Sequence, residues 1–147
     1  MKSTEARQGR TFVIRLEQDE IVHETLERFA RDHGIRAATV ILVGGADAGS
    51  HLVVGPAGRG PGKPEPMVHE LQGVHEIAGV GTVFPDESGA PVLHMHASCG
   101  RRGTVTTGCV RAGVKTWVVG EAVMTELTEC RATRKKDEKT GFALLSV

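Results

Sequence analysis

Two histidines and a cysteine are the residues of this sequence best suited to chemistry. His94 and His96 are separated by one residue, and Cys109 follows a Gly-Arg-Arg-Gly stretch further along the chain. Zinc binds imidazole nitrogens at about 2.0–2.1 Å and thiolate sulfur at about 2.3 Å. The three residue types therefore predict a divalent metal site, with zinc as the expected ion, if the fold brings these side chains together.

A β-hairpin would bring the three side chains together. Residues i and i+2 of a strand share a face, so His94 and His96 are expected to point to the same side. If Gly100 pairs with Gly103, Cys109 lies directly across from His94, with Cβ atoms about 5 Å apart. A slip of one residue would move the cysteine to the opposite face. Because the Arg-Arg pair between the glycines suits the tightest turns poorly, a longer loop is the alternative.

The same residues also fit an ordinary hairpin without a metal. In that interpretation, His94 and His96 are polar residues on the wetter face of an amphipathic strand, and Cys109 is a small core residue. If a metal is bound, three protein ligands leave a fourth position, which is open in catalytic zinc sites or could be filled by a neighbouring subunit. The metal site and the ordinary hairpin are therefore competing hypotheses.

The elements that would position these residues follow from apolar periodicity. Residues 11–16 are rich in β-branched and aromatic residues and predict a first strand. Asp19 is the expected N-cap of a helix whose apolar face runs from Val22 to Ala30, and Gly34 is expected to end it. Residues 38–43 are continuously apolar and predict a strand buried on both faces. This order predicts a right-handed crossover if the two strands lie parallel.

The remainder of the chain is dominated by predicted antiparallel strands. A Gly/Pro-rich segment, residues 55–66, is expected to be a flexible loop. The expected strands are 50–54, 68–71, 74–84, 92–98, 104–110 and 116–127, with a closing strand at 142–147 after a solvated loop at 134–141. The predicted fold class is α+β, with one main helix packed on a mixed, largely antiparallel β-sheet.

The composition predicts one soluble domain. Eighteen basic and eighteen acidic side chains balance, which argues against a general electrostatic affinity for nucleic acid or an anionic membrane. Four phenylalanines, one tryptophan and no tyrosine are too few for a base-stacking surface. Three scattered cysteines, a polar N-terminus and the lack of an apolar run of ~20 residues favour the cytoplasm. We expect residues 1–10 to be disordered and residues 11–147 to form the domain.

Three motifs resemble a known domain family. They are Gly73-Val-His-Glu-Ile-Ala-Gly-Val-Gly-Thr-Val-Phe84, Leu93-His-Met-His96 and Gly103-Thr-Val-Thr-Thr-Gly-Cys-Val110. Together they resemble the PPC (plants and prokaryotes conserved) domain, over a region from about residue 11 to the C-terminus. Glu76 and Ile77 match the first motif, His75 replaces its aromatic residue, and Cys109 stands where the family usually has a third histidine.

The resemblance implies an α+β fold, a homotrimer and a metal-binding histidine cluster. Cysteine is as good a zinc ligand as imidazole, so the change at Cys109 is compatible with metal binding. Plant members carry the domain beside an AT-hook, and the resemblance therefore implies a DNA-binding, regulatory role. In this chain Gly58-Arg-Gly-Pro-Gly-Lys-Pro64 is similar to an AT-hook, but it lacks the second arginine that would enter the minor groove.

Two further hypotheses stand beside DNA binding. The first is a metal-dependent hydrolase or lyase acting on a small molecule, because bound zinc lowers the pKa of water towards about 7. Glu76 is then the candidate general base, or a group that orients a ligating histidine. The second is a trimeric interaction module in which any metal only stabilises a subunit interface.

Overall fold

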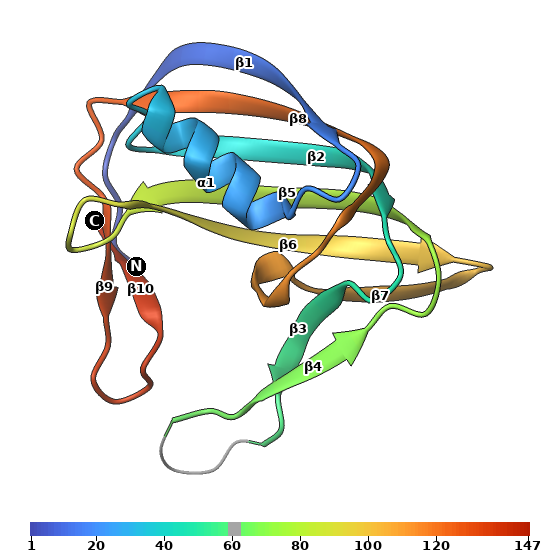
Figure 1. Ribbon diagram of the computed structural model, residues 1–147. Coiled ribbons are helices and arrows are strands. Elements are labelled where there is room, and N and C mark those ends of the chain that lie inside the picture. The colour runs from blue at the N-terminus through green and yellow to red at the C-terminus, as the bar shows by residue number, and fades with distance from the viewer. Residues whose placement is uncertain (59–62) are drawn as a thin grey trace.

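In the part of the chain that the structure describes, one α-helix lies across one face of a large antiparallel sheet (Figure 1). The structure is a computed structural model that describes residues 1–58 and 63–147. Its elements are β1 (Arg7–Glu17), α1 (Val22–Asp32), β2 (Ala38–Ala46), β3 (His51–Pro56), β4 (Pro66–Glu70), β5 (His75–Pro85), β6 (Pro91–Arg101), β7 (Thr104–Cys109), the 3-10 turn η1 (Val110–Ala112), β8 (Thr116–Thr128), β9 (Thr133–Lys136) and β10 (Ala143–Ser146).

The main sheet has eight strands in the order β1-β8-β2-β5-β6-β7-β3-β4, and β9 pairs with β10 in a separate hairpin. Every described strand pair is antiparallel, so the α+β prediction is confirmed with a sheet less mixed than expected. The first two strands lie parallel to each other only because β8 runs between them. Two hairpins, β3–β4 and β9–β10, project from the same side of the sheet in Figure 1.

The helix forms where its apolar periodicity predicts, but it begins differently. Val22, Leu26 and Ala30 are buried against the sheet. The predicted N-cap, Asp19, is wrong, because its backbone has φ 68° and the helix starts after Ile21 without a side-chain cap. The Val22 amide instead donates to the carbonyl of Val114 at 2.9 Å. A neighbouring chain segment thus satisfies a helix-terminal amide that a capping side chain usually serves.

The predicted end of the helix agrees with the structure. Gly34 follows the helix with φ 66°, and its amide donates to the Arg31 carbonyl at 3.1 Å. This left-handed conformation suits glycine, which has no Cβ to clash with the preceding turn.

The prediction that residues 38–43 are buried on both faces is wrong. Val40 and Leu42 are buried, but Ile41 and Val43 on the other face of β2 are 58% and 48% exposed. In the described chain, α1 covers one face of the sheet and no second helical layer covers the other. A continuously apolar run in this fold therefore leaves half of its side chains on an open apolar face.

The predicted segment ends need three corrections. The disorder predicted for residues 1–10 is wrong for residues 7–10, which extend β1 along its partner β8. Of the loop predicted at 55–66, Ala57 still pairs with Glu65 across the hairpin, and residues 59–62, with most of the AT-hook-like motif, lie outside the described residues. The loop predicted at 134–141 begins as β9, and the predicted closing strand pairs with β9 instead of the main sheet.

None of the described helices is long and apolar enough to cross a membrane.

Candidate metal centre

The β6–β7 hairpin turns on two residues, Arg102 and Gly103. Both have positive φ, 50° and 80°, and Arg101 pairs with Thr104 across the turn. Two consecutive positive φ values are typical of the type I′ turn, whose twist matches that of the flanking strands. Glycine at the second position supplies the conformation at little steric cost.

This turn corrects the predicted register. Cys109 pairs with His96 and not, as predicted, with His94. The register differs from the expected one by two residues, because the turn pairs Arg101 with Thr104 and leaves only Arg102 and Gly103 between them. A shift of two residues preserves the face on which each side chain lies.

The structure brings all three predicted ligands together. One donor atom from each of His94, His96 and Cys109 lies within 4.8 Å of the other two. The Nε2 atoms of the two histidines are 3.3 Å apart, and their rings stand nearly perpendicular at 85°. Two nitrogens bound to one tetrahedral zinc ion at about 2.0–2.1 Å are about 3.3 Å apart. The histidine pair therefore already has the spacing of two zinc ligands, and the sulfur lies within reach.

The charge state of His94 also suits metal binding. Desolvation at the site lowers the pKa of the His94 imidazole, and the positive charge of Arg134, then His96 and Arg111, lowers it further. A lowered pKa keeps the ring neutral at neutral pH. The lone pair of an unprotonated nitrogen is then available to a cation.

The three cysteines have different surroundings. Cys109 is half-buried beside the histidines. Cys99 lies on the covered face of β6, where burial raises the pKa of its thiol to about 11. Cys130 packs against a small cluster that contains Ala37 and Phe84. In the described part of the chain, only Cys109 lies where a thiolate could act together with the histidines.

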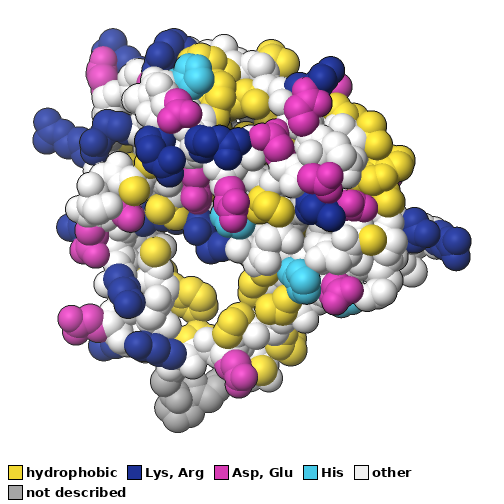
Figure 2. Space-filling view, in the orientation of Figure 1, with side chains coloured by type: hydrophobic (Ala, Val, Ile, Leu, Met, Phe, Trp, Pro, Cys, Tyr) yellow, Lys and Arg dark blue, Asp and Glu magenta, His cyan; other side chains and the backbone are white. Residues whose placement is uncertain are grey.

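A cleft of about 990 Å³ opens beside the cluster. Figure 2 shows the opening between the two projecting hairpins. Its lining includes the three candidate ligands, apolar residues from both hairpins, and two arginines, Arg111 and Arg134. The sequence interpretation did not include these arginines. Arg111 follows Cys109 by two residues, whereas Arg134 joins the site through Thr82, which is 52 positions away in the sequence.

Glu76 is not brought to the cluster. It pairs with Gly100, whereas His96 pairs with Val80, four residues further along β5. At about 3.3 Å per residue, this separation is about 13 Å along the strand. Glu76 is also absent from the residues that line the cleft. Its position therefore supports neither a general-base role nor the orientation of a ligating histidine.

Most of the sequence matches one domain family. The match is to the Plants and Prokaryotes Conserved (PCC) domain and covers residues 3–128. The chain belongs to the PCC domain family. This confirms the family resemblance seen in the three motifs, for which PPC is the other form of the name. No curated protein matches the sequence.

Several solved structures share the fold of this chain. A PPC protein from Pyrococcus horikoshii is 25% identical, with a TM-score of 0.85 and coverage of 100% of this chain and 98% of its own. A protein from Archaeoglobus fulgidus, named as metal-containing, is 26% identical, with a TM-score of 0.81 and full coverage of both chains. A "putative DNA-binding protein" from Ralstonia eutropha is 19% identical, with a TM-score of 0.73 and coverage of 92% and 90%.

Proposed function

We propose that this PCC-domain protein binds one divalent metal ion, zinc by its donor set, through His94, His96 and Cys109. The 3.3 Å separation of the two Nε2 atoms carries the proposal, because it matches two ligands of one tetrahedral ion. The metal-containing relative from Archaeoglobus fulgidus supports it. Bound zinc would supply a Lewis-acid centre beside the cleft, and the three side chains would hold it there.

Metal content tests the proposal directly. Untagged protein, stripped and then reloaded with Zn²⁺, is expected to hold about one ion per chain by elemental analysis, and His94→Ala is expected to lose it. The control is His69→Ala, because His69 is an exposed histidine of β4 that is not part of the cluster. Retention of the ion by His94→Ala, or its equal loss from the control, would contradict the assignment.

Cobalt substitution tests the cysteine separately. A thiolate bound to Co²⁺ gives a sulfur-to-metal charge-transfer band in the near ultraviolet, which is expected in the wild type and absent in Cys109→Ser. The control is Cys99→Ser, because Cys99 lies on the covered face of the same hairpin. If both variants keep the band, Cys109 is not a ligand.

The open apolar face supports the proposed homotrimer. Val13, Val123, Ile41 and Val80 are each more than 40% exposed and pair in this order across β1, β8, β2 and β5. The row continues to His96 on β6. A contiguous exposed apolar surface on a soluble domain marks an interaction site, and a second copy is the partner always present.

Sedimentation tests the assembly. We expect the mass of three chains for the wild type and of one chain for Ile41→Lys, because a buried lysine at the centre of the row would lack a partner. The control is Val105→Lys, because Val105 is 66% exposed but lies near the hairpin turn, outside the row. A monomeric wild type, or dissociation of the control, would contradict this interface.

Regulatory DNA association is a second proposal. It is supported by the name of the Ralstonia eutropha relative and by exposed Lys135 and Lys136 on the β9–β10 hairpin. Phosphate contacts make affinity fall steeply as salt rises. Binding to duplex DNA should therefore weaken with salt, with a shallower slope in a Lys135→Ala/Lys136→Ala variant. Affinity independent of salt would contradict it.

A metal-dependent hydrolase or lyase is the third proposal, supported by the cleft beside the cluster. Because Glu76 lies away from the cluster, any proton transfer would need another group. Turnover of ester or amide probes by zinc-loaded protein, lost in His94→Ala, would support this role. Activity unchanged in His94→Ala would exclude the site as its source.

A further inference from the structure

We infer that the cleft binds a small organic carboxylate. Arg134 donates hydrogen bonds to the carboxylate group, and the apolar part of the molecule packs against the apolar side chains of the two hairpins. The cleft also touches the candidate metal ligands, but the proposed carboxylate contact with Arg134 does not require a bound metal. The site lies partly beyond the shared family region, because Arg134 follows residues 3–128, which match the PCC domain.

Arg134 is a buried cation with unused hydrogen-bonding capacity. The residue is only 6% exposed, yet it lines the cleft. One guanidinium nitrogen, Nη2, donates to the Thr82 hydroxyl at 3.1 Å, and the guanidinium lies 5.8 Å from the centre of the Phe84 ring. Its Nε is buried and has no hydrogen-bond partner among the described residues. A buried donor without an acceptor costs free energy, and an acceptor arriving through the cleft would recover it.

No carboxylate of the described chain offsets the charge of Arg134. None of the described ion pairs includes this residue. Burial and then the nearby charge of Arg111 lower the pKa of the Arg134 guanidinium, whereas Cys109 acts in the opposite direction. A guanidinium nevertheless stays protonated in proteins. The site therefore presents a permanent positive charge that an anionic ligand would neutralise.

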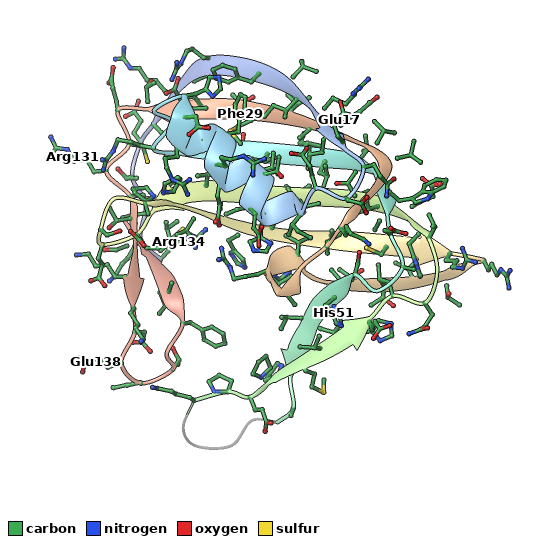
Figure 3. The ribbon with its side chains drawn as sticks, in the orientation of Figure 1. Glu17, Phe29, His51, Arg131, Arg134 and Glu138 are labelled. Atoms are coloured by element: carbon green, nitrogen blue, oxygen red, sulfur yellow. The ribbon has the colours of Figure 1, made fainter. Side chains whose placement is uncertain are left out.

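The strand register places this charge beside the metal cluster. Thr82, which holds Arg134, pairs directly with His94 across β5 and β6. Arg111 is fastened nearby, because it donates to the carbonyl of Leu93 and pairs with Glu27 at 3.3 Å. Figure 3 shows Arg134 where the β9–β10 hairpin joins the sheet, whereas Arg131 points outward from the same segment. The cation thus lies at the inner end of the cleft.

The walls of the cleft favour a ligand with an apolar body. Val53, Pro56 and Pro66 line the β3–β4 side, and Phe142 and Leu144 line the β10 side. Pockets of roughly 300–1,000 Å³ with apolar walls and a few polar groups are typical of small-molecule sites. The planar fork of arginine matches a carboxylate, which can accept two parallel hydrogen bonds. An organic acid satisfies both features, whereas inorganic phosphate would use only the charge.

Octanoate is the probe that tests this site. We expect metal-stripped wild-type protein to bind octanoate saturably by calorimetry and to bind 1-octanol, its neutral analogue, at least about tenfold more weakly. In ¹H–¹⁵N spectra, octanoate should shift the Nε–Hε signal of Arg134, identified as the signal missing in Arg134→Met. Equal affinity for octanol or for inorganic phosphate, or an unmoved Arg134 signal, would overturn the assignment.

Paired variants show whether octanoate binding depends on the Arg134 guanidinium or is weakened by any arginine substitution in this segment. Arg134→Met is expected to weaken octanoate binding by roughly tenfold to a hundredfold, and Arg134→Lys by less, because lysine keeps the charge without the fork. Arg131→Met, an exposed arginine three residues away, should bind like the wild type. Circular dichroism checks that the variants fold, and equal loss in the Arg131 control would overturn the proposal. Octanoate binding is measured on metal-free protein. Its absence would therefore overturn the carboxylate site alone, and a failed metal-content test would overturn the metal site alone.

Discussion

The two faces of the main sheet carry different chemistry on the same strands. On β6, Met95 and Cys99 are fully buried beneath the helical layer, whereas His94 and His96, which flank Met95 in sequence, point to the open face. Alternation along a strand produces this division. The covered face contributes stability through packing, and the open face is free to bind ions, ligands or a second copy.

The contrast is sharpest between two cysteines of one hairpin. Cys99 is inaccessible, and its thiol pKa is raised to about 11, so it remains a protonated, inert side chain at neutral pH. Cys109 lies across from His96 in the candidate metal site. The same residue type is therefore a packing group on one face and a candidate ligand on the other.

The largest expected difference between the faces is in stability. Met95→Ala should lower the free energy of unfolding by about 2–5 kcal/mol, because it leaves a cavity in the core. His96→Ala, its neighbour on the open face, should cost metal-free protein no more than about 0.5 kcal/mol. Urea unfolding at one protein concentration measures both. Similar losses would show that the open face is packed as tightly as the covered one.

The next effect is a pH dependence that belongs to the covered face. Burial raises the pKa of Cys99 from 9.0 to about 11, so the unfolded chain releases this proton at a lower pH than the native protein does. Stability should therefore fall as pH rises from about 9 to 11, by up to about 3 kcal/mol. Urea titrations over this range should show the loss in Cys130→Ala but not in Cys99→Ala. An identical fall in both variants would contradict the cause.

The smallest of the three effects concerns the turn that sets the register between β6 and β7. Gly103→Ala should cost roughly 1–2 kcal/mol, because φ 80° forces its Cβ against the backbone. Gly100→Ala adds a Cβ whose nearest neighbour is 3.9 Å away, an ordinary contact, and should stay within about 0.5 kcal/mol of the wild type. Thermal and urea unfolding compare them. Equal costs would favour the register in which these glycines face each other.

Much of the fold follows from local patterns in the sequence. The helix and its glycine end, the strand-rich second half and the shared face of His94 and His96 were all predicted from periodicity. The errors have physical causes. Asp19 does not cap the helix because backbone from the segment before β8 takes that place, and β2 is open on one face because α1 covers only the other. Apolar periodicity shows which residues form an apolar face, but it does not show whether another element packs on that face.

The candidate site was also predicted only in part. Its three proposed ligands could be chosen from residue type and spacing, because a two-residue error in register leaves every side chain on its face. Their actual pairing depended on a turn of two positive φ values, which the sequence interpretation did not expect at Arg102 and Gly103.

The sequence by itself determined which residues are candidate ligands and that they share a face, since both follow from residue identity and the two-residue repeat of a strand. Only the tertiary structure decided that Arg134 meets Thr82 beside His94, that the two hairpins enclose a cleft, and that Glu76 lies elsewhere. The Arg134–Thr82 contact alone joins residues 52 positions apart in the sequence. Contacts of that kind depend on strand order and packing, which no local pattern of side chains encodes.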